Sequence, residues 1–162
     1  MKVLKFGGTS VGSVKGLANV KRIVEAAEED VIVVVSALGG ITDRLLLTAQ
    51  LASEGNEAYL TEYAEIVRRH DEVIDGIVPE VVREGVKRHV RETLGELENI
   101  YRGVYLIRDL SRKTSDTIVS YGERLSSFII SHIIEGAELY DSCEFIKTID
   151  RFDKHIVDFE AT

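Results

Sequence analysis

The distribution of apolar residues predicts a strand–helix–strand unit at the start of the chain. Residues 2–6 (KVLKF) form a short strand-like stretch that runs directly into two glycines. Apolar residues then recur every three or four positions over residues 17–27, as on one face of a helix. Residues 31–35 (VIVVV) are a continuous β-branched run, typical of a strand that is buried on both faces of a parallel sheet. We therefore expect a βαβ unit, whose crossover is right-handed in nearly all known cases.

Helical periodicity dominates the middle of the chain. Two long amphipathic patterns cover residues 57–75 and 80–109. Between them lie Gly76 and Pro79, the only proline. Glycine is common just after the end of a helix, and proline is common at the start of the next. We expect a helical hairpin, inserted on an α/β core at about residues 57–109.

The rest of the chain contains few predicted strands. A helix is expected at about residues 115–135, followed by a strand at residues 138–141. Residues 150–162 contain too few apolar side chains to predict a further strand. Three strands are few for a parallel sheet, so we expect an α/β fold of which a part is missing.

Composition excludes several classes of function. The 162 residues include 28 acidic and 20 basic side chains, a net charge of −8, without a Lys/Arg cluster that would favour nucleic acid. No apolar run approaches the roughly 18 residues of a membrane span, and glycines interrupt the N-terminus before a signal peptide could form. The single cysteine, Cys143, and the scattered histidines predict neither a disulfide nor a metal site. These features predict a cytoplasmic domain that binds neither nucleic acid nor membrane.

The first candidate site follows the first predicted strand. Lys5 stands near the end of this strand, and Gly7, Gly8, Thr9 and Ser10 follow before a helix. Glycines let the backbone approach an anion closely, and N–H groups at the start of a helix can bind phosphate oxygens. The spacing matches neither a Walker A loop nor G-x-G-x-x-G, so a glycine turn without a ligand is the alternative.

Two further motifs are candidates for the same site. Ser36 ends the second predicted strand, two glycines follow, and Thr42 is expected to cap the next helix. Loops after both strands of a βαβ unit lie at one edge of the sheet, so together they favour a pocket for a small anion. On a later helix, Ser120, Glu123 and Ser127 share one face, where a carboxylate could hold an ammonium group. A solvated helix face is the alternative for this third motif.

Other polar residues are interpreted as structural. His70 lies on an apolar stripe and is expected to pack in the core. The basic pair Arg68 and Arg69 is expected on a solvated helix face. Neither position therefore enters the candidate site.

The three motifs together resemble those of aspartate kinases of the amino-acid kinase superfamily. They are KFGGTS at residues 5–10, SALGGITD at residues 36–43 and SYGERLSS at residues 120–127. The resemblance covers nearly the whole chain, whose ending is similar to the kinase part of bifunctional aspartate kinase–homoserine dehydrogenases. It implies a three-layer αβα sandwich with a mainly parallel sheet. It also implies transfer of the ATP γ-phosphoryl group to the β-carboxylate of L-aspartate, the first step of lysine, threonine and methionine biosynthesis.

The resemblance also implies a role for each matched residue. Lys5 would be the catalytic cation that stabilises the transferring phosphoryl group, and the Gly7–Ser10 loop would surround the phosphate of ATP. Ser36 and Thr42 would contact the substrate. Glu123 would bind the α-ammonium group of aspartate. ATP with Mg²⁺ would be the co-substrate, with no tightly bound cofactor and no metal ligands in this chain.

The chain also departs from the pattern of complete aspartate kinases. Their Arg-Gly-Gly-Ser-Asp loop, the ATP-binding half of their sheet and their regulatory ACT domains are missing from residues 1–162. We therefore expect residues 1–162 to be the N-terminal, amino-acid-binding part of the catalytic domain. Alone this part would be inactive, and the full-length protein would be a homo-oligomer. The alternatives are another amino-acid kinase superfamily member, or a non-catalytic aspartate-binding or assembly module.

Overall fold

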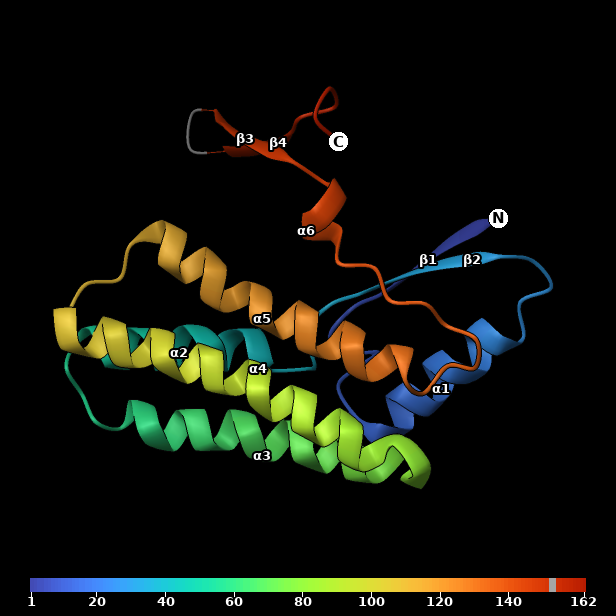
Figure 1. Cartoon of the computed structure of the whole chain (residues 1–162), viewed down its shortest axis with the longest axis horizontal. Helices are drawn as coiled ribbons and strands as arrows, with labels where there is room; N and C mark the ends of the chain where they lie inside the picture. Colours follow the sequence, from blue (N-terminus) through green and yellow to red (C-terminus); the bar gives the residue numbers. More distant parts are fainter. Residues whose placement is uncertain (152–153) are drawn as a thin grey trace.

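The computed structural model describes residues 1–151 and 154–162, which form a parallel strand pair, a helical bundle and a small C-terminal hairpin (Figure 1). None of the described helices is long and apolar enough to span a membrane. The elements, in chain order, are β1 (Lys2–Phe6), α1 (Val14–Glu25), β2 (Val31–Val35), α2 (Ile41–Ser53), α3 (Tyr59–Ile77), α4 (Glu80–Ile107), α5 (Arg112–Ser131), α6 (Ser142–Phe145), β3 (Thr148–Arg151) and β4 (Lys154–Val157).

The predicted βαβ unit is confirmed. Strands β1 and β2 pair in parallel, in a register that places Lys2 beside Val31 and Phe6 beside Val35. Helix α1 lies between them in the chain and begins after Ser13, whose Oγ accepts a hydrogen bond from the Gly16 N–H at 3.0 Å. This cap satisfies one of the free N–H groups at the helix start. Because β1 and β2 are parallel and Phe6 lies beside Val35, both strands end at the same edge of the sheet.

The strand pair is covered on one face only in the part of the chain that the structure describes. Val33 of β2 packs against the core. Ile32 and Val34 on the other face are 47% and 45% exposed, and Val3 of β1 is 64% exposed. Because successive side chains of a strand point to opposite faces, helices packed on one side leave every second residue uncovered. The prediction that the strand at residues 31–35 is buried on both faces is therefore wrong for Ile32 and Val34.

The predicted helical hairpin is confirmed by α3 and α4, which lie side by side (Figure 1). Both helices pack against α2, and α4 also packs against α5. Four helices therefore share one apolar interior. The residues of this interior that are at most 1% exposed include Leu45, Ala49, Ile66, Ile74, Val90, Leu94, Leu97, Tyr101, Ile118, Leu125 and Ile129. Burial of these side chains is the main source of stability of the bundle, because each removes apolar surface from water.

The positions of Gly76 and Pro79 relative to the helix ends agree only in part with the prediction. Pro79 directly precedes the first residue of α4, as expected. Gly76, however, lies inside α3 and does not end it. A Cβ atom at Gly76 would lie 2.5 Å from Cγ2 of Val14 at the start of α1. The glycine is needed because α3 approaches α1 too closely for a side chain.

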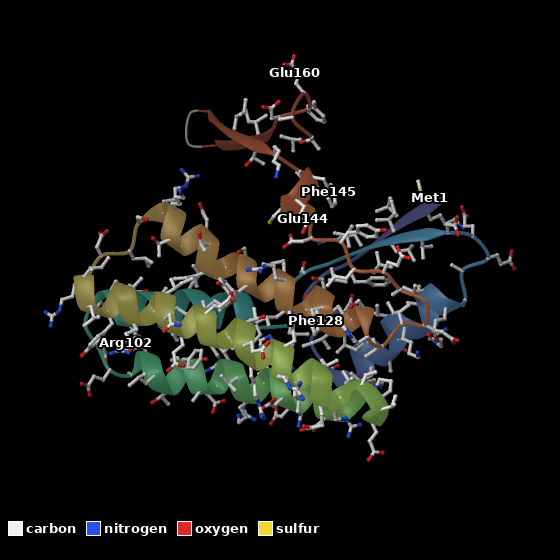
Figure 2. The ribbon with its side chains drawn as sticks, in the orientation of Figure 1. Met1, Arg102, Phe128, Glu144, Phe145 and Glu160 are labelled. Carbon is white, nitrogen blue, oxygen red and sulfur yellow. The ribbon has the colours of Figure 1, made fainter. Side chains whose placement is uncertain are left out.

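The C-terminal segment differs from the prediction. Residues 138–141 are not a strand, and Tyr140 among them is 70% exposed. Asp141 instead caps α6, because its Oδ1 accepts a hydrogen bond from the Cys143 N–H at 2.9 Å. Strands β3 and β4 pair antiparallel where no strand was expected, because a very short connection suffices to join two antiparallel strands. Residues 152–153 lie outside the described residues. Phe145 of α6 stands away from the bundle (Figure 2).

His70 of α3 is fully buried, as expected for a packing histidine. Its Nδ1 lies 2.7 Å from the Ile66 carbonyl oxygen, and its Nε2 has no hydrogen-bond partner in the described part of the chain. Burial lowers the pKa of His70, although the Ile66 carbonyl and the nearby Asp71 carboxylate act in the opposite direction. The imidazole is therefore neutral in the folded protein near neutral pH.

We predict that the free energy of unfolding decreases as the pH falls below about 6.5, the ordinary pKa of histidine. The pKa of His70 is lower in the folded state. The unfolded state therefore takes up the proton first, and stability is lost as the pH falls. Denaturant unfolding between pH 8 and pH 5 would measure this loss, with His70→Leu as the comparison. An equal loss of stability in His70→Leu over this range would contradict the prediction.

Candidate functional site

Two loops meet where β1 and β2 end. We name them glycine loop 1 (residues 7–12) and glycine loop 2 (residues 36–40). A Cβ atom at Gly39 would lie 2.9 Å from the Gly12 Cα atom and 3.0 Å from the Gly8 carbonyl oxygen. Distances this short leave no room for a side chain, so the contact requires glycine. The expectation that the two loops lie side by side is confirmed.

Glycine loop 1 is a tight turn. The N–H groups of Ser10 and Val11 both donate to the Gly7 carbonyl oxygen, at 2.8 and 3.2 Å. The N–H groups of Gly8 and Thr9 donate no hydrogen bond to any described residue. Unpaired backbone N–H groups in a glycine turn are suitable donors to an anion. The loop thus has the donors that the sequence analysis expected.

Lys5 supplies a cation beside this turn. It is an exposed residue of β1, and its Nζ lies 3.8 Å from where a Cβ atom of Gly7 would stand. Lys5 forms no ion pair with the described residues. Its ammonium group is therefore available to a ligand at glycine loop 1. The structure brings Lys5 and the Gly7–Ser10 segment together.

Helix α5 is attached to glycine loop 2 by two side chains. The Oγ of Ser126, a fully buried residue, donates to the Ser36 carbonyl oxygen at 2.6 Å. The Ala37 N–H donates to Oε1 of the half-buried Glu123 at 3.4 Å. Helix and loop approach closely at Gly122, where a Cβ atom would lie 2.7 Å from that of Ala37. The structure therefore brings Glu123 to the loop that contains Ser36.

Ser126 is the residue that the sequence analysis missed. The hydroxyls of Ser120 and Ser127, which were expected to line the ligand face, donate to carbonyls of their own helix at 2.7 and 3.0 Å. Of these three serines, only Ser126 donates a hydrogen bond to glycine loop 2. The available signal was its spacing of four residues from Gly122, because two small residues on one helix face indicate a close approach.

Thr42 lies in the first turn of α2 and does not cap it. The helix begins at Ile41, and the residue before it, Gly40, has a φ of 80° and provides no side-chain cap. A left-handed conformation at this point favours glycine and sets the entry of the chain into the helix. The prediction of Thr42 as the N-cap is therefore wrong. Thr42 is half-buried and follows the last residue of glycine loop 2, Gly40, by two positions in the sequence.

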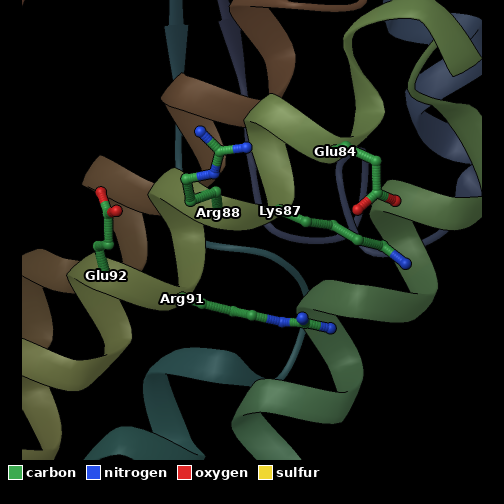
Figure 3. Close-up of a pocket in the computed structure, with 5 residues that line it drawn as sticks. All are labelled: Glu84, Lys87, Arg88, Arg91 and Glu92. Atoms are coloured by element: carbon green, nitrogen blue, oxygen red, sulfur yellow. The ribbon is translucent and has the colours of Figure 1, made fainter.

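A surface hollow on α4 is not part of this site (Figure 3). It measures about 410 Å³ and is lined by Glu84, Lys87, Arg88, Arg91 and Glu92. Lys87 Nζ lies 2.7 Å from Oδ1 of Asp75 on α3. Arg91 Nη2 lies 3.2 Å from Oδ2 of Asp71 on the same helix. Because neighbouring carboxylates offset these cations, the hollow is a poor anion site.

We predict that Ser126→Ala lowers the free energy of unfolding by about 1 kcal/mol, the usual net contribution of one hydrogen bond within a protein. The matched control is Ser127→Ala, which removes a hydroxyl bonded only within its own helix. Its effect should stay within about 0.5 kcal/mol. Denaturant unfolding of both variants measures the difference, and equal effects would show that the Ser126–Ser36 contact adds no stability.

Comparison with known proteins gives matches over nearly the whole chain. Residues 1–153 match the amino acid kinase family. The chain is 31% identical over 160 residues to chloroplastic aspartokinase 1 of Arabidopsis thaliana. It is 26% identical over 149 residues to the chloroplastic bifunctional aspartokinase/homoserine dehydrogenase 2 of the same plant. Both alignments cover 91% of this chain, but 27% and 16% of the relatives. The chain thus spans about a quarter or less of these relatives.

Two solved structures have the same fold. E. coli aspartokinase III in complex with aspartate and ADP (R-state) matches 99% of this chain with a TM-score of 0.83 and 26% identity. The same enzyme in complex with lysine and aspartate (T-state) matches with a TM-score of 0.84 and 24% identity. The matches cover 35% and 36% of those chains. The predicted α/β fold is confirmed.

Proposed function

Because this chain belongs to the amino acid kinase family, we propose that it is the aspartate-binding part of an aspartate kinase. The enzyme would transfer the γ-phosphoryl group of ATP to the β-carboxylate of L-aspartate. The observation that carries the proposal is the meeting of two glycine loops with Glu123 at one sheet edge. It is supported by the aspartokinase III structure, a complex with aspartate and ADP.

Glu123 is the proposed ligand of the α-ammonium group of aspartate. One of its oxygens accepts the Ala37 N–H, which orients the carboxylate at glycine loop 2. The other oxygen can accept a charge-assisted hydrogen bond from an ammonium group, which is stronger than a bond between neutral groups. The hydroxyls of Ser36 and Thr42 are the proposed contacts to the rest of the substrate.

Glycine loop 1 and Lys5 are the proposed phosphoryl site. The β-carboxylate of aspartate has an ordinary pKa of about 3.9 and is ionised at neutral pH, so its attack on phosphorus needs no general base. The task of the protein is then to position two anions and to stabilise the charge of the transferring group. The N–H groups of Gly8 and Thr9 and the Lys5 ammonium group supply this stabilisation.

ATP would enter as Mg²⁺-ATP, whose metal ion neutralises phosphate charge. Among the described residues, no group of three or more His, Cys, Asp and Glu side chains could hold a metal ion. We therefore assign the ion no ligands here. The exposed apolar face of the sheet, with Val3, Ile32 and Val34, is suited to a further layer of structure. We propose that the ATP-binding half of a homo-oligomeric enzyme supplies that layer, and that residues 1–162 alone do not turn over.

We predict that Lys5→Met in the full-length protein lowers kcat for phosphoryl transfer at least a hundredfold, the usual cost of removing one stabilising group from a phosphoryl or oxyanion site. The fold should be retained, because Lys5 is exposed. The matched control is Lys15→Met, which removes an exposed lysine from the first turn of α1. A coupled assay of ADP release and a thermal unfolding curve measure both effects. Unchanged turnover in Lys5→Met would contradict the assigned role.

A further inference from the structure

Helix α3 contacts both ends of the segment that connects glycine loop 1 to α1. Nη2 of Arg69 donates to the carbonyl oxygen of Gly12, the last residue of the loop. At Gly76, a Cβ atom would lie 2.5 Å from Cγ2 of Val14, the first residue of α1. Arg69 and Gly76 are seven positions apart, about two helical turns, so they share one face of α3. One helix face thus holds the chain on both sides of Ser13.

The two neighbouring arginines of α3 have different environments. Arg68 pairs with Glu65 at 2.8 Å, and its side chain is 56% exposed, as expected for a solvated helix face. The side chain of Arg69 is 33% exposed and reaches a loop 57 positions away in the sequence. The prediction that both arginines are solvated is therefore wrong for Arg69. It lies on the helix face that packs toward α1.

We propose that Arg69 is a positioning residue for phosphoryl transfer, and that the α3–α4 hairpin sets the geometry of glycine loop 1 through it. This inference rests on the proposed function. Gly12 is the point where the two loops touch, because a Cβ atom there would lie 2.8 Å from the Gly8 carbonyl oxygen and 3.3 Å from the Gly39 Cα atom. A displacement of Gly12 therefore moves the proposed phosphate donors relative to glycine loop 2.

The chemistry of the contact suits a positioning role. A guanidinium donates to a carbonyl through a charge-assisted hydrogen bond in a planar, fixed geometry. Helix α3 is itself held rigidly, because Ile66, Val73 and Ile74 are at most 1% exposed in the bundle. The second contact, at Gly76, keeps α3 close enough to α1 for the Arg69 side chain to reach the loop. Because Arg69 Nη1 also lies 3.8 Å from Oε2 of Glu72, its charge is partly offset, and its role is the hydrogen bond to Gly12.

Steady-state kinetics of the full-length protein test the proposal. Arg69→Met should lower kcat about tenfold or more, the loss expected for one charge-assisted hydrogen bond. The KM for aspartate should change less than about twofold, since the proposed aspartate ligands remain in place. Arg68→Met is the matched control and should leave both constants near the wild-type values. Arg69→Lys keeps the charge but loses the planar fork, and should recover only part of kcat.

Hydrogen–deuterium exchange of residues 7–14 in the full-length protein gives a second measurement that does not depend on activity. Arg69→Met and Gly76→Ala should each speed exchange in this segment. Gly85→Ala on α4 should not, because a Cβ atom there meets open space. If Arg69→Met fails to fold, Arg69→Lys, which keeps the positive charge, provides the test.

The possible outcomes separate the two proposals. A wild-type protein without aspartate kinase activity would overturn the proposed function, while exchange would still test the contact of α3 with the loop. A wild-type enzyme in which Arg69→Met behaves as Arg68→Met in both assays would overturn the role of Arg69 alone. A rise in the KM for aspartate in Arg69→Met, with no fall in kcat, would also overturn the positioning role of Arg69.

Discussion

Direct backbone contact between the two glycine loops is the constraint on which the rest of the structure depends. Gly12 and Gly39 touch at distances that admit no side chain, so the ends of β1 and β2 carry their loops as one unit. Each loop is then held by a different helix. Ser126 of α5 holds glycine loop 2, and Arg69 of α3 holds glycine loop 1. Because the loops touch, the four-helix bundle fixes both.

This arrangement resolves an electrostatic difficulty. A chain with a net charge of −8 repels anions at long range, so the proposed site for aspartate and ATP needs positive charge concentrated locally. The Lys5 ammonium group, the free N–H groups of glycine loop 1 and the Arg69 guanidinium all lie at one sheet edge. Glu72, one of whose carboxylate oxygens lies 3.8 Å from Arg69, offsets part of this charge. Glu123, the carboxylate bonded to glycine loop 2, matches the one cationic group of aspartate. The charges of the site thus correspond to those of the proposed substrate.

Hydrophobic periodicity and the topology of a βαβ unit were enough to predict the start of the fold. The βαβ unit followed from strand and helix periodicity, and the adjacency of the loops followed from the topology of that unit. Contacts between distant segments were not predictable in this way. Ser126 and Arg69 look like ordinary helix-surface residues until the packing of α5 and α3 places them against loops. The start of α2 was expected near Thr42 and lies at Ile41, but the N-cap was assigned to the wrong residue because Gly40 adopts a left-handed conformation that composition does not reveal.

The most direct test of the proposed aspartate site is a binding comparison between L-aspartate and succinate, which differs only in lacking the α-ammonium group. Titration calorimetry should show that the full-length protein binds aspartate at least tenfold more tightly. Glu123→Gln should abolish this preference, whereas Glu92→Gln, at the hollow on α4, should retain it. Equal affinity of the wild-type protein for the two ligands, or an unchanged preference in Glu123→Gln, would contradict the account.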